Sequence, residues 1–182
     1  VHLNNAGAAL MPKVVADIQR AIVDEEETMG GYEAAAARKE DTEAFYTEAA
    51  ALLNCSPDEV AFVDSATRAW TLAFHSLPLK SGDRVITHAS DYGSNFVTYL
   101  QAKQRVGIEL VIVPDDESGA IDIAALRREA AHPRTTAVCL CHVPTGGGLV
   151  NPAAEVAEVA RGVGAWYLLD ACQSVGQLRV DV

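Results

Sequence analysis

Residue types that could do chemistry stand directly behind short apolar runs of this sequence, and Asp170 is the clearest example. It closes the run WYLL at residues 166–169 and is followed by ACQS at residues 171–174. A carboxylate at the end of a buried strand needs a partner, because burying an unpaired charge costs several kcal/mol or shifts its pKa until it is neutral. A structural partner would be a helix N-terminus or an arginine. A functional partner would be a protonated ring nitrogen or a metal ion.

A second polar turn, DSAT at residues 64–67, separates an apolar run from a predicted helix. Its backbone N–H groups and the hydroxyls of Ser65 and Thr67 could hold an anion at the positive end of the helix dipole. An ordinary N-cap made by Ser65 or Thr67 is the simpler interpretation. Both interpretations stay open from this segment alone.

Two more loops follow predicted strands. The first, HASDYGSN at residues 88–95, contains Tyr92, which is either a surface aromatic or a platform for a flat ring. The second, HVPTGGG at residues 142–148, is glycine-rich enough to let backbone approach a ligand, although three glycines also simply make a loop.

Metal and nucleotide motifs are weak or missing. Cys139, Cys141 and His142 offer zinc-ligand types, but both thiols fall on one face of a predicted buried strand and no second pair has zinc-finger spacing. Plain core cysteines are therefore favoured. Neither Gly-x-Gly-x-x-Gly behind a strand nor a P-loop is present.

The elements that must position these residues alternate between short apolar runs and longer amphipathic stretches, which is typical of βαβ units and a parallel sheet. Strands are predicted at residues 59–63, 85–87, 110–113, 136–141 and 166–170, and helices at 67–77, 94–106, 123–131 and 152–163. Two earlier helices, 12–28 and 40–53, are joined by GGY at residues 30–32 and an alanine-rich segment. We expect a helical arm over residues 1–55 and an α/β domain over residues 56–182.

Composition narrows the class of protein. The 182 residues are 49% hydrophobic, and 25 acidic against 14 basic side chains give a net charge of −11. An acidic chain without a basic cluster argues against a nucleic-acid partner, and no apolar run approaches the roughly 20 residues that span a bilayer. Four cysteines without a disulfide-like pattern favour the reducing cytoplasm.

Taken in order, these segments resemble the class V aminotransferase family, which are fold type I enzymes that use pyridoxal 5′-phosphate (PLP). The resemblance implies an α/β fold, the large domain of these enzymes, with a three-layer doubly wound and mainly parallel sheet whose C-terminal part is missing. The segments that carry it are LNNAGA (3–8), GGYEA (30–34), DSATRA (64–69), DYGSN (91–95), HVPT (142–145) and LDACQSVG (169–176).

The resemblance also implies roles for single residues. Asp170 would pair with the pyridine nitrogen and keep it protonated, and Gln173 would hydrogen-bond the 3-oxygen of the ring. Tyr92 would lie on the ring face, and Thr145 would belong to the loop that reaches the ring oxygen. The phosphate would be held by Ser65, Ala66 and Thr67, and the substrate would lie near Asn5, Ala6 and Gly7.

Two departures bear on the reaction. Cysteine desulfurases and selenocysteine lyases of the family have a histidine where this chain has Tyr92, and an asparagine where it has Thr145. The pattern is therefore closer to the isopenicillin N epimerase-like branch, including C–S lyases that share the GGY segment. A homodimer acting at the α-carbon of an amino acid is implied, with transamination, elimination and epimerisation left open.

The Schiff-base lysine of the family should follow Asp170, and no lysine follows it here. The four lysines present are Lys13, Lys39, Lys80 and Lys103, none in a matching context. Because that amine anchors the cofactor and acts as the base, we expect no catalytic residue in this chain and no turnover by it alone. We expect a fragment of a longer enzyme. The alternatives are a natural lysine-free paralogue, a non-catalytic module for dimerisation or ligand binding, and a flavodoxin-like nucleotide binder.

Overall fold

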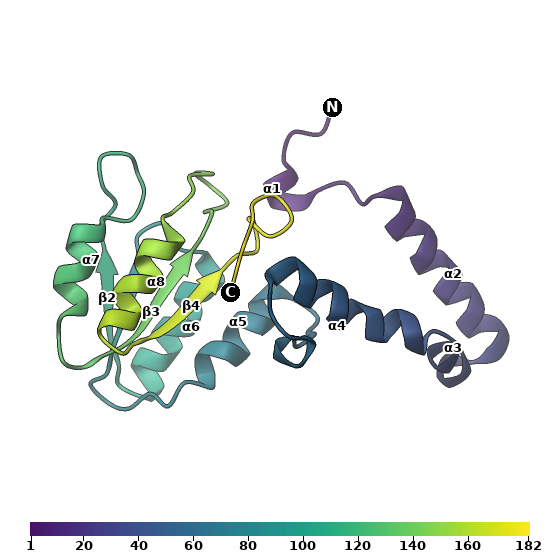
Figure 1. Cartoon of the computed structure of the whole chain (residues 1–182), viewed down its shortest axis with the longest axis horizontal. Helices are drawn as coiled ribbons and strands as arrows, with labels where there is room; N and C mark the ends of the chain where they lie inside the picture. The colour runs from purple at the N-terminus through teal and green to yellow at the C-terminus, as the bar shows by residue number, and fades with distance from the viewer. The chain divides into compact units, whose positions relative to one another are not determined.

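The computed structural model describes all 182 residues and divides them into two compact units (Figure 1). The first unit comprises Val1–Phe62 together with Arg179–Val182, and the second comprises Val63–Leu178. None of the helices has both the length and the apolar character needed to cross a membrane.

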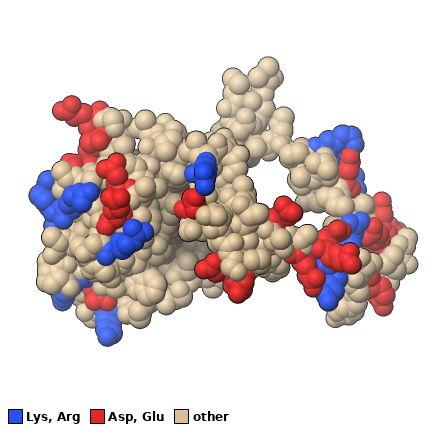
Figure 2. Space-filling model, viewed as in Figure 1, with Lys and Arg blue, Asp and Glu red and all other residues tan.

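The first unit is helical. Its elements are α1 (Asn5–Ala8), α2 (Lys13–Met29), α3 (Gly31–Ala37), α4 (Lys39–Leu53) and the short 3₁₀ helix η1 (Pro57–Glu59). Arg38, at the junction of α3 and α4, donates two hydrogen bonds of 2.6 Å to Glu25 of α2. Few side chains are buried here, and α2 buries none. Figure 2 shows acidic and basic side chains interspersed, with no broad basic patch on the face in view.

The second unit is an α/β domain. Its strands are β1 (Arg84–His88), β2 (Glu109–Val113), β3 (Thr135–Cys141) and β4 (Trp166–Asp170), and its helices are α5 (Ala66–His75), α6 (Gly93–Arg105), α7 (Ile123–Ala130) and α8 (Ala153–Gly162). The strands form one sheet in the order β2-β1-β3-β4, and every neighbouring pair is parallel. The α/β parallel sheet expected from the sequence is confirmed.

Both faces of the sheet are covered, because alternate strand residues point to opposite sides. On one face Val85 and Cys139 pack with Trp70 and Phe74 of α5 and with Tyr99 of α6. On the other face α7 and α8 pack on a second cluster that includes strand residues 86, 138 and 140. The result is three layers, with a layer of helices on each face of the sheet.

The strand predicted at residues 59–63 is wrong. Ser56 and Glu59 form a capping box around η1, and the chain then runs to residue 65 without entering a sheet. Val60 does have extended backbone, with φ −100° and ψ 128°. Extended backbone becomes a strand only where a neighbour supplies ladder hydrogen bonds, and no neighbour does so here.

Two short segments of the first unit are also helical. The opening segment forms a helical turn, α1, because the side chain of Asn4 accepts a hydrogen bond of 3.2 Å from the backbone N–H of Gly7 and caps the turn. The alanine-rich connection after Gly30 is itself a helix, α3.

The amino end of the sheet is closed by ion pairs. Arg84, at the start of β1, is 7% exposed. Its guanidinium donates to Glu109 at 3.1 Å, to the carboxylate of Glu129 at 2.7 Å and to the backbone carbonyl of Glu129 at 2.8 Å. A buried cation is thus fully paired at this end.

Candidate functional site

The carboxyl ends of β1, β3 and β4 meet, which is where ligands bind in open α/β sheets. Cys141 at the end of β3 lies opposite Asp170 at the end of β4 in the strand register. The backbone N–H of Cys141 also donates a 3.1 Å hydrogen bond to Nε2 of His88 at the end of β1. Three strand ends are therefore in direct contact at one edge.

Asp170 is half-buried and is held by backbone and amide donors, not by a cation. Its Oδ1 accepts from the backbone N–H of Cys172 at 3.1 Å, and its Oδ2 accepts from Nδ2 of Asn95 at 2.9 Å. Its backbone carbonyl accepts from the N–H of His142 at 2.9 Å. No lysine or arginine forms a salt bridge with it. The arginine partner that the sequence left open is thus absent.

Asn95, in the first turn of α6, is a site residue that the sequence analysis missed. It is 1% exposed, and Nδ2 donates to Asp91 at 3.0 Å as well as to Asp170. The signal that could have found it is local: it follows Asp91 by four residues, the spacing at which side chains meet on a helix. The hydrogen bond to Asp170 joins residues 75 positions apart, so no local sequence pattern indicates it.

The start of α5 confirms the N-cap interpretation of the DSAT turn. Ser65 is the N-cap, and its hydroxyl accepts from the backbone N–H of Arg68 at 3.3 Å. The Thr67 hydroxyl instead lies 3.2 Å from the hydroxyl of Ser94, which ties the first turn of α5 to that of α6. The first N–H groups of a helix lack intrahelical acceptors, so these turns can receive an anion.

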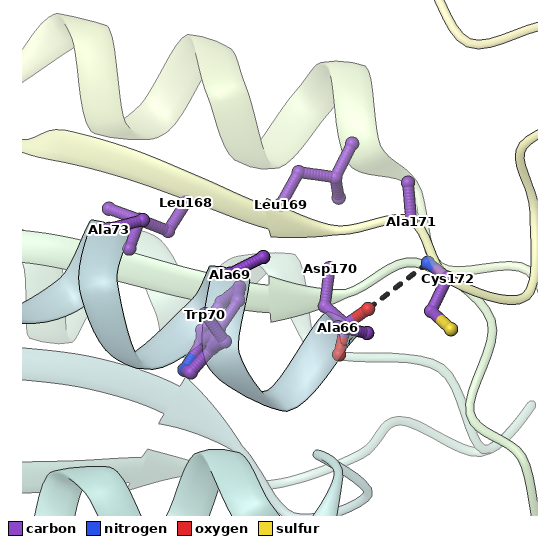
Figure 3. Close-up of a pocket in the computed structure, with 9 residues that line it drawn as sticks. All are labelled: Ala66, Ala69, Trp70, Ala73, Leu168, Leu169, Asp170, Ala171 and Cys172. Atoms are coloured by element: carbon purple, nitrogen blue, oxygen red, sulfur yellow. Dashed lines mark hydrogen bonds between the residues drawn. The ribbon is translucent and has the colours of Figure 1, made fainter. Parts of the chain in front are cut away.

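A cavity of about 380 Å³ lies between α5 and β4 (Figure 3). Its walls are small or apolar, and Asp170 is the one charged residue in its lining. Figure 3 places Asp170 beside Ala66 at the first turn of α5 and shows its bond to Cys172. The lining residues are Ala66, Ala69, Trp70, Ala73, Leu168, Leu169, Asp170, Ala171 and Cys172.

The structure brings together only part of the predicted set. The turn at 65–67, the segment at 94–95 and Asp170 are linked by the contacts above. Tyr92 is the residue before α6 and is 48% exposed, and Gln173 is half-buried in the turn after β4. Thr145 is exposed in the loop after β3, and no hydrogen bond joins it to Asp170. Asn5, Ala6 and Gly7 form α1 in the other unit.

The other titratable groups at this edge favour their neutral forms. Burial lowers the pKa of His88, although Asp91 and Asp115 act in the opposite direction. Burial, with a smaller contribution from Asp170, raises the pKa of the Cys141 thiol to about 12. No protein cation faces Asp170 at this edge, so the site suits a ligand with a cationic group near Asp170 and an anionic group near α5.

The cysteine pair does not form a metal site. Cys139 and Cys141 are buried free thiols on β3, and no group of three potential ligands is close enough to hold a metal ion. Cys139 packs in the cluster beneath α5 and α6.

Curated relatives of this chain are cysteine desulfurases. A probable cysteine desulfurase from Methanothermobacter thermautotrophicus is 32% identical over 133 residues, which are 73% of this chain and 33% of the relative. The cysteine desulfurase of Synechococcus elongatus is 31% identical over 189 residues, all of this chain and 30% of the relative. This chain thus spans about a third of the length of these relatives.

Solved structures share the fold. A C-DES variant with glycine covalently linked to its PLP cofactor superposes with a TM-score of 0.89 at 22% identity, covering 99% of this chain and 49% of C-DES. The cysteine desulfurase CsdA from Escherichia coli gives a TM-score of 0.84 at 20% identity, covering 98% and 46%.

The family model agrees with these likenesses and covers more of the chain than most of the pairwise matches. It describes class-V aminotransferases and matches residues 1–182, from the first residue of the helical unit to the last of the chain. The resemblance carried by the six sequence segments is thereby confirmed, and the chain belongs to the aminotransferase class-V family.

Proposed function

We propose that this chain supplies part of a PLP site in an enzyme that acts at the α-carbon of an amino acid. The observation that carries the proposal is Asp170: a carboxylate without a cationic partner, at the carboxyl end of a parallel strand and beside the first turn of α5. Bound PLP supplies an electron sink for negative charge that develops at the α-carbon.

The residues present fit that cofactor. Each oxygen of Asp170 accepts one hydrogen bond, so the carboxylate keeps lone pairs free for a protonated pyridine nitrogen. The N–H groups after Ser65 would hold the phosphate, and Thr67 is already fixed beside them by Ser94. Tyr92 is proposed for the ring face, and Gln173 and Thr145 for the ring oxygen.

The relatives support a sulfur-containing amino acid as the substrate. Those named above are cysteine desulfurases, and a neighbour with a TM-score of 0.86 is the cystine C–S lyase C-DES, bound to its product cysteine persulfide. We place cleavage of a C–S bond first, with transamination and epimerisation as the other branches. Substrate contacts are proposed for Asn5, Ala6 and Gly7, and a homodimer is proposed for the whole protein.

The lysines of the second unit do not serve this site. Lys80 precedes β1 and lies at the amino end of the sheet, where its backbone N–H donates to Asp83 at 2.8 Å. Lys103 lies in the last turn of α6, whose first turn holds Asn95. Neither amine is placed to act on a substrate near Asp170, so the chain alone should bind the cofactor without turnover.

The test is an equilibrium titration of the 182-residue chain with pyridoxamine 5′-phosphate, followed by absorbance. This form of the cofactor has no aldehyde, so it cannot react with lysines elsewhere on the surface. We expect saturable binding that weakens at least about tenfold in Asp170→Asn, because a hydrogen bond between charged groups is lost. Asp83→Asn, at the opposite end of the sheet, should bind like the wild type. Absence of saturable binding, or equal affinity of Asp170→Asn, would contradict the proposal.

A second candidate, a non-catalytic module of the same fold, is favoured by the placement of Lys80 and Lys103. In the form of this candidate that serves dimerisation, no ligand of this type binds and the chain self-associates. Sedimentation equilibrium with and without pyridoxamine phosphate separates the two candidates: a dimer without ligand binding would favour the module.

A further inference from the structure

The two carboxylates at the carboxyl edge of the sheet have different hydrogen-bond capacity. Asp91 accepts four hydrogen bonds, two at each oxygen. Its Oδ1 accepts from the N–H of Tyr92 at 2.7 Å and from Asn95 at 3.0 Å. Its Oδ2 accepts from the hydroxyls of Thr87 at 2.6 Å and Tyr99 at 2.7 Å. A carboxylate has about four lone-pair sites, so Asp91 is saturated and has none left for a ligand.

Asp91 is also fixed in place. Its donors come from β1, from the loop before α6 and from α6 itself, and Tyr99 is fully buried. Asn95 donates the two hydrogens of its amide nitrogen to the two carboxylates, one to each. Because Asp91 is fixed, it holds the amide of Asn95 in place, and this amide in turn holds the carboxylate of Asp170. Asp170 has only one other side-chain partner, the N–H of Cys172.

From this asymmetry we propose that Asn95, anchored by Asp91, is a positioning residue that sets the orientation of the Asp170 carboxylate toward its ligand. A neutral amide is suited to this work because it holds the carboxylate without neutralising it, whereas an arginine would cancel the charge that a cationic ring nitrogen needs. The ligand part of the inference rests on the proposed function, and the positioning part does not.

The test uses Asn95→Leu, which removes both hydrogen bonds at similar volume, and Asn95→Ser, which cannot reach both carboxylates and leaves room for water. Asn151→Leu is the matched control. Asn151 is 2% exposed and also makes two hydrogen bonds, with the N–H of Ile121 and the carbonyl of Cys141, but it does not touch Asp170. Thermal unfolding first identifies which variants are folded.

Two measurements follow on the folded variants. Pyridoxamine phosphate labelled with ¹⁵N in its ring reports, by NMR, whether the ring nitrogen is protonated when bound, a readout that a loss of stability alone would not move. We expect the dissociation constant to rise about tenfold in the Asn95 variants and the ring-nitrogen signal to move toward the neutral form. The Asn151 control should keep the wild-type signal.

Crystal structures of the ligand-free wild type and Asn95→Ser give the second measurement. A reoriented Asp170 side chain supports the inference, and an unmoved side chain together with unchanged affinity overturns it. If the wild type does not bind pyridoxamine phosphate, the proposed function falls, and the orientation of Asp170 in the ligand-free structures still decides whether Asn95 positions it.

Discussion

The two ends of the same sheet differ in whether their charged side chains have partners of opposite charge. At the amino end, Arg84 is buried and meets two carboxylates, Glu109 and Glu129, so the cation is matched within the protein. At the carboxyl end, Asp91 and Asp170 share one neutral amide, and no cation pairs with either. The first arrangement holds the fold together, and the second leaves charge available for a partner from outside.

The difference teaches how a stabilising cluster can be told from a binding cluster. Both contain buried polar groups joined by short hydrogen bonds, so burial and bond length do not separate them. What separates them is whether the buried charge is paired with an opposite charge within the chain, as it is at Arg84, or is not, as at Asp170.

Breaking the ion pairs of Arg84 at the amino end of the sheet should have the largest effect on stability. Arg84→Met removes three hydrogen bonds from a buried guanidinium, and we expect the free energy of unfolding to fall by about 2–3 kcal/mol. Urea denaturation measures this loss. The affinity of the folded variant for pyridoxamine phosphate should not change, and a stable variant would mean that the ion pairs contribute little.

The next effect is acid sensitivity at the carboxyl end. Burial lowers the pKa of His88 below its ordinary value of 6.5, so the unfolded chain takes up this proton first as the pH falls. The free energy of unfolding should therefore decrease below about pH 6.5, by at most about 1.4 kcal/mol per pH unit for this group. Urea denaturation at pH 5 to 7 should show a shallower decrease for His88→Gln than for the wild type. Identical slopes for the wild type and His88→Gln would contradict the expectation.

Removing the charge of Asp170 at the carboxyl end of the sheet should barely alter stability. In Asp170→Asn, the new amide nitrogen cannot accept, so one of the two hydrogen bonds to this side chain is lost while repulsion from Asp91 is relieved. The free energy of unfolding should therefore change by less than about 1 kcal/mol. Ligand affinity falls in the same variant. A large destabilisation would show that Asp170 serves the fold, as Arg84 does.

Breaking an exposed ion pair should have the smallest effect on the free energy of unfolding. Lys39 and Glu43 lie 3.5 Å apart on α4, with side chains 73% and 65% exposed. Lys39→Ala should change the free energy of unfolding by less than about 0.5 kcal/mol, because solvent screens the pair. Chemical denaturation in low and high salt provides the check, and an effect as large as that of Arg84→Met would remove burial as the reason for the contrast.

Much of the fold was predictable because its signals are local. Apolar runs mark β1 to β4, and the helices between them begin near polar caps such as Ser65 and Asp122. The segment at 59–63 was mistaken for a strand because its composition is that of a strand, whereas strand formation depends on a partner that no local pattern reveals.

For the candidate site, the sequence indicated two positions that the structure places at the carboxyl edge of the sheet. Asp170 could be identified because a carboxylate ending an apolar run is unusual in itself, and Ser65 could be identified as a helix cap. Asn95 could not be assigned a role, because its importance comes from a contact with Asp170 that only the folded sheet creates. Ligand contacts for Tyr92, Thr145 and Gln173 remain predictions.

The strand order β2-β1-β3-β4 has a consequence for how the sheet grows during synthesis on the ribosome. β2 can add to β1 as soon as it emerges, β3 then joins the other side of β1, and β4 joins β3. Each new strand docks at an open edge, and none has to insert between two strands that are already paired. Each parallel pairing must still wait for a crossover connection to close, so chain elongation and sheet assembly can advance together, strand by strand.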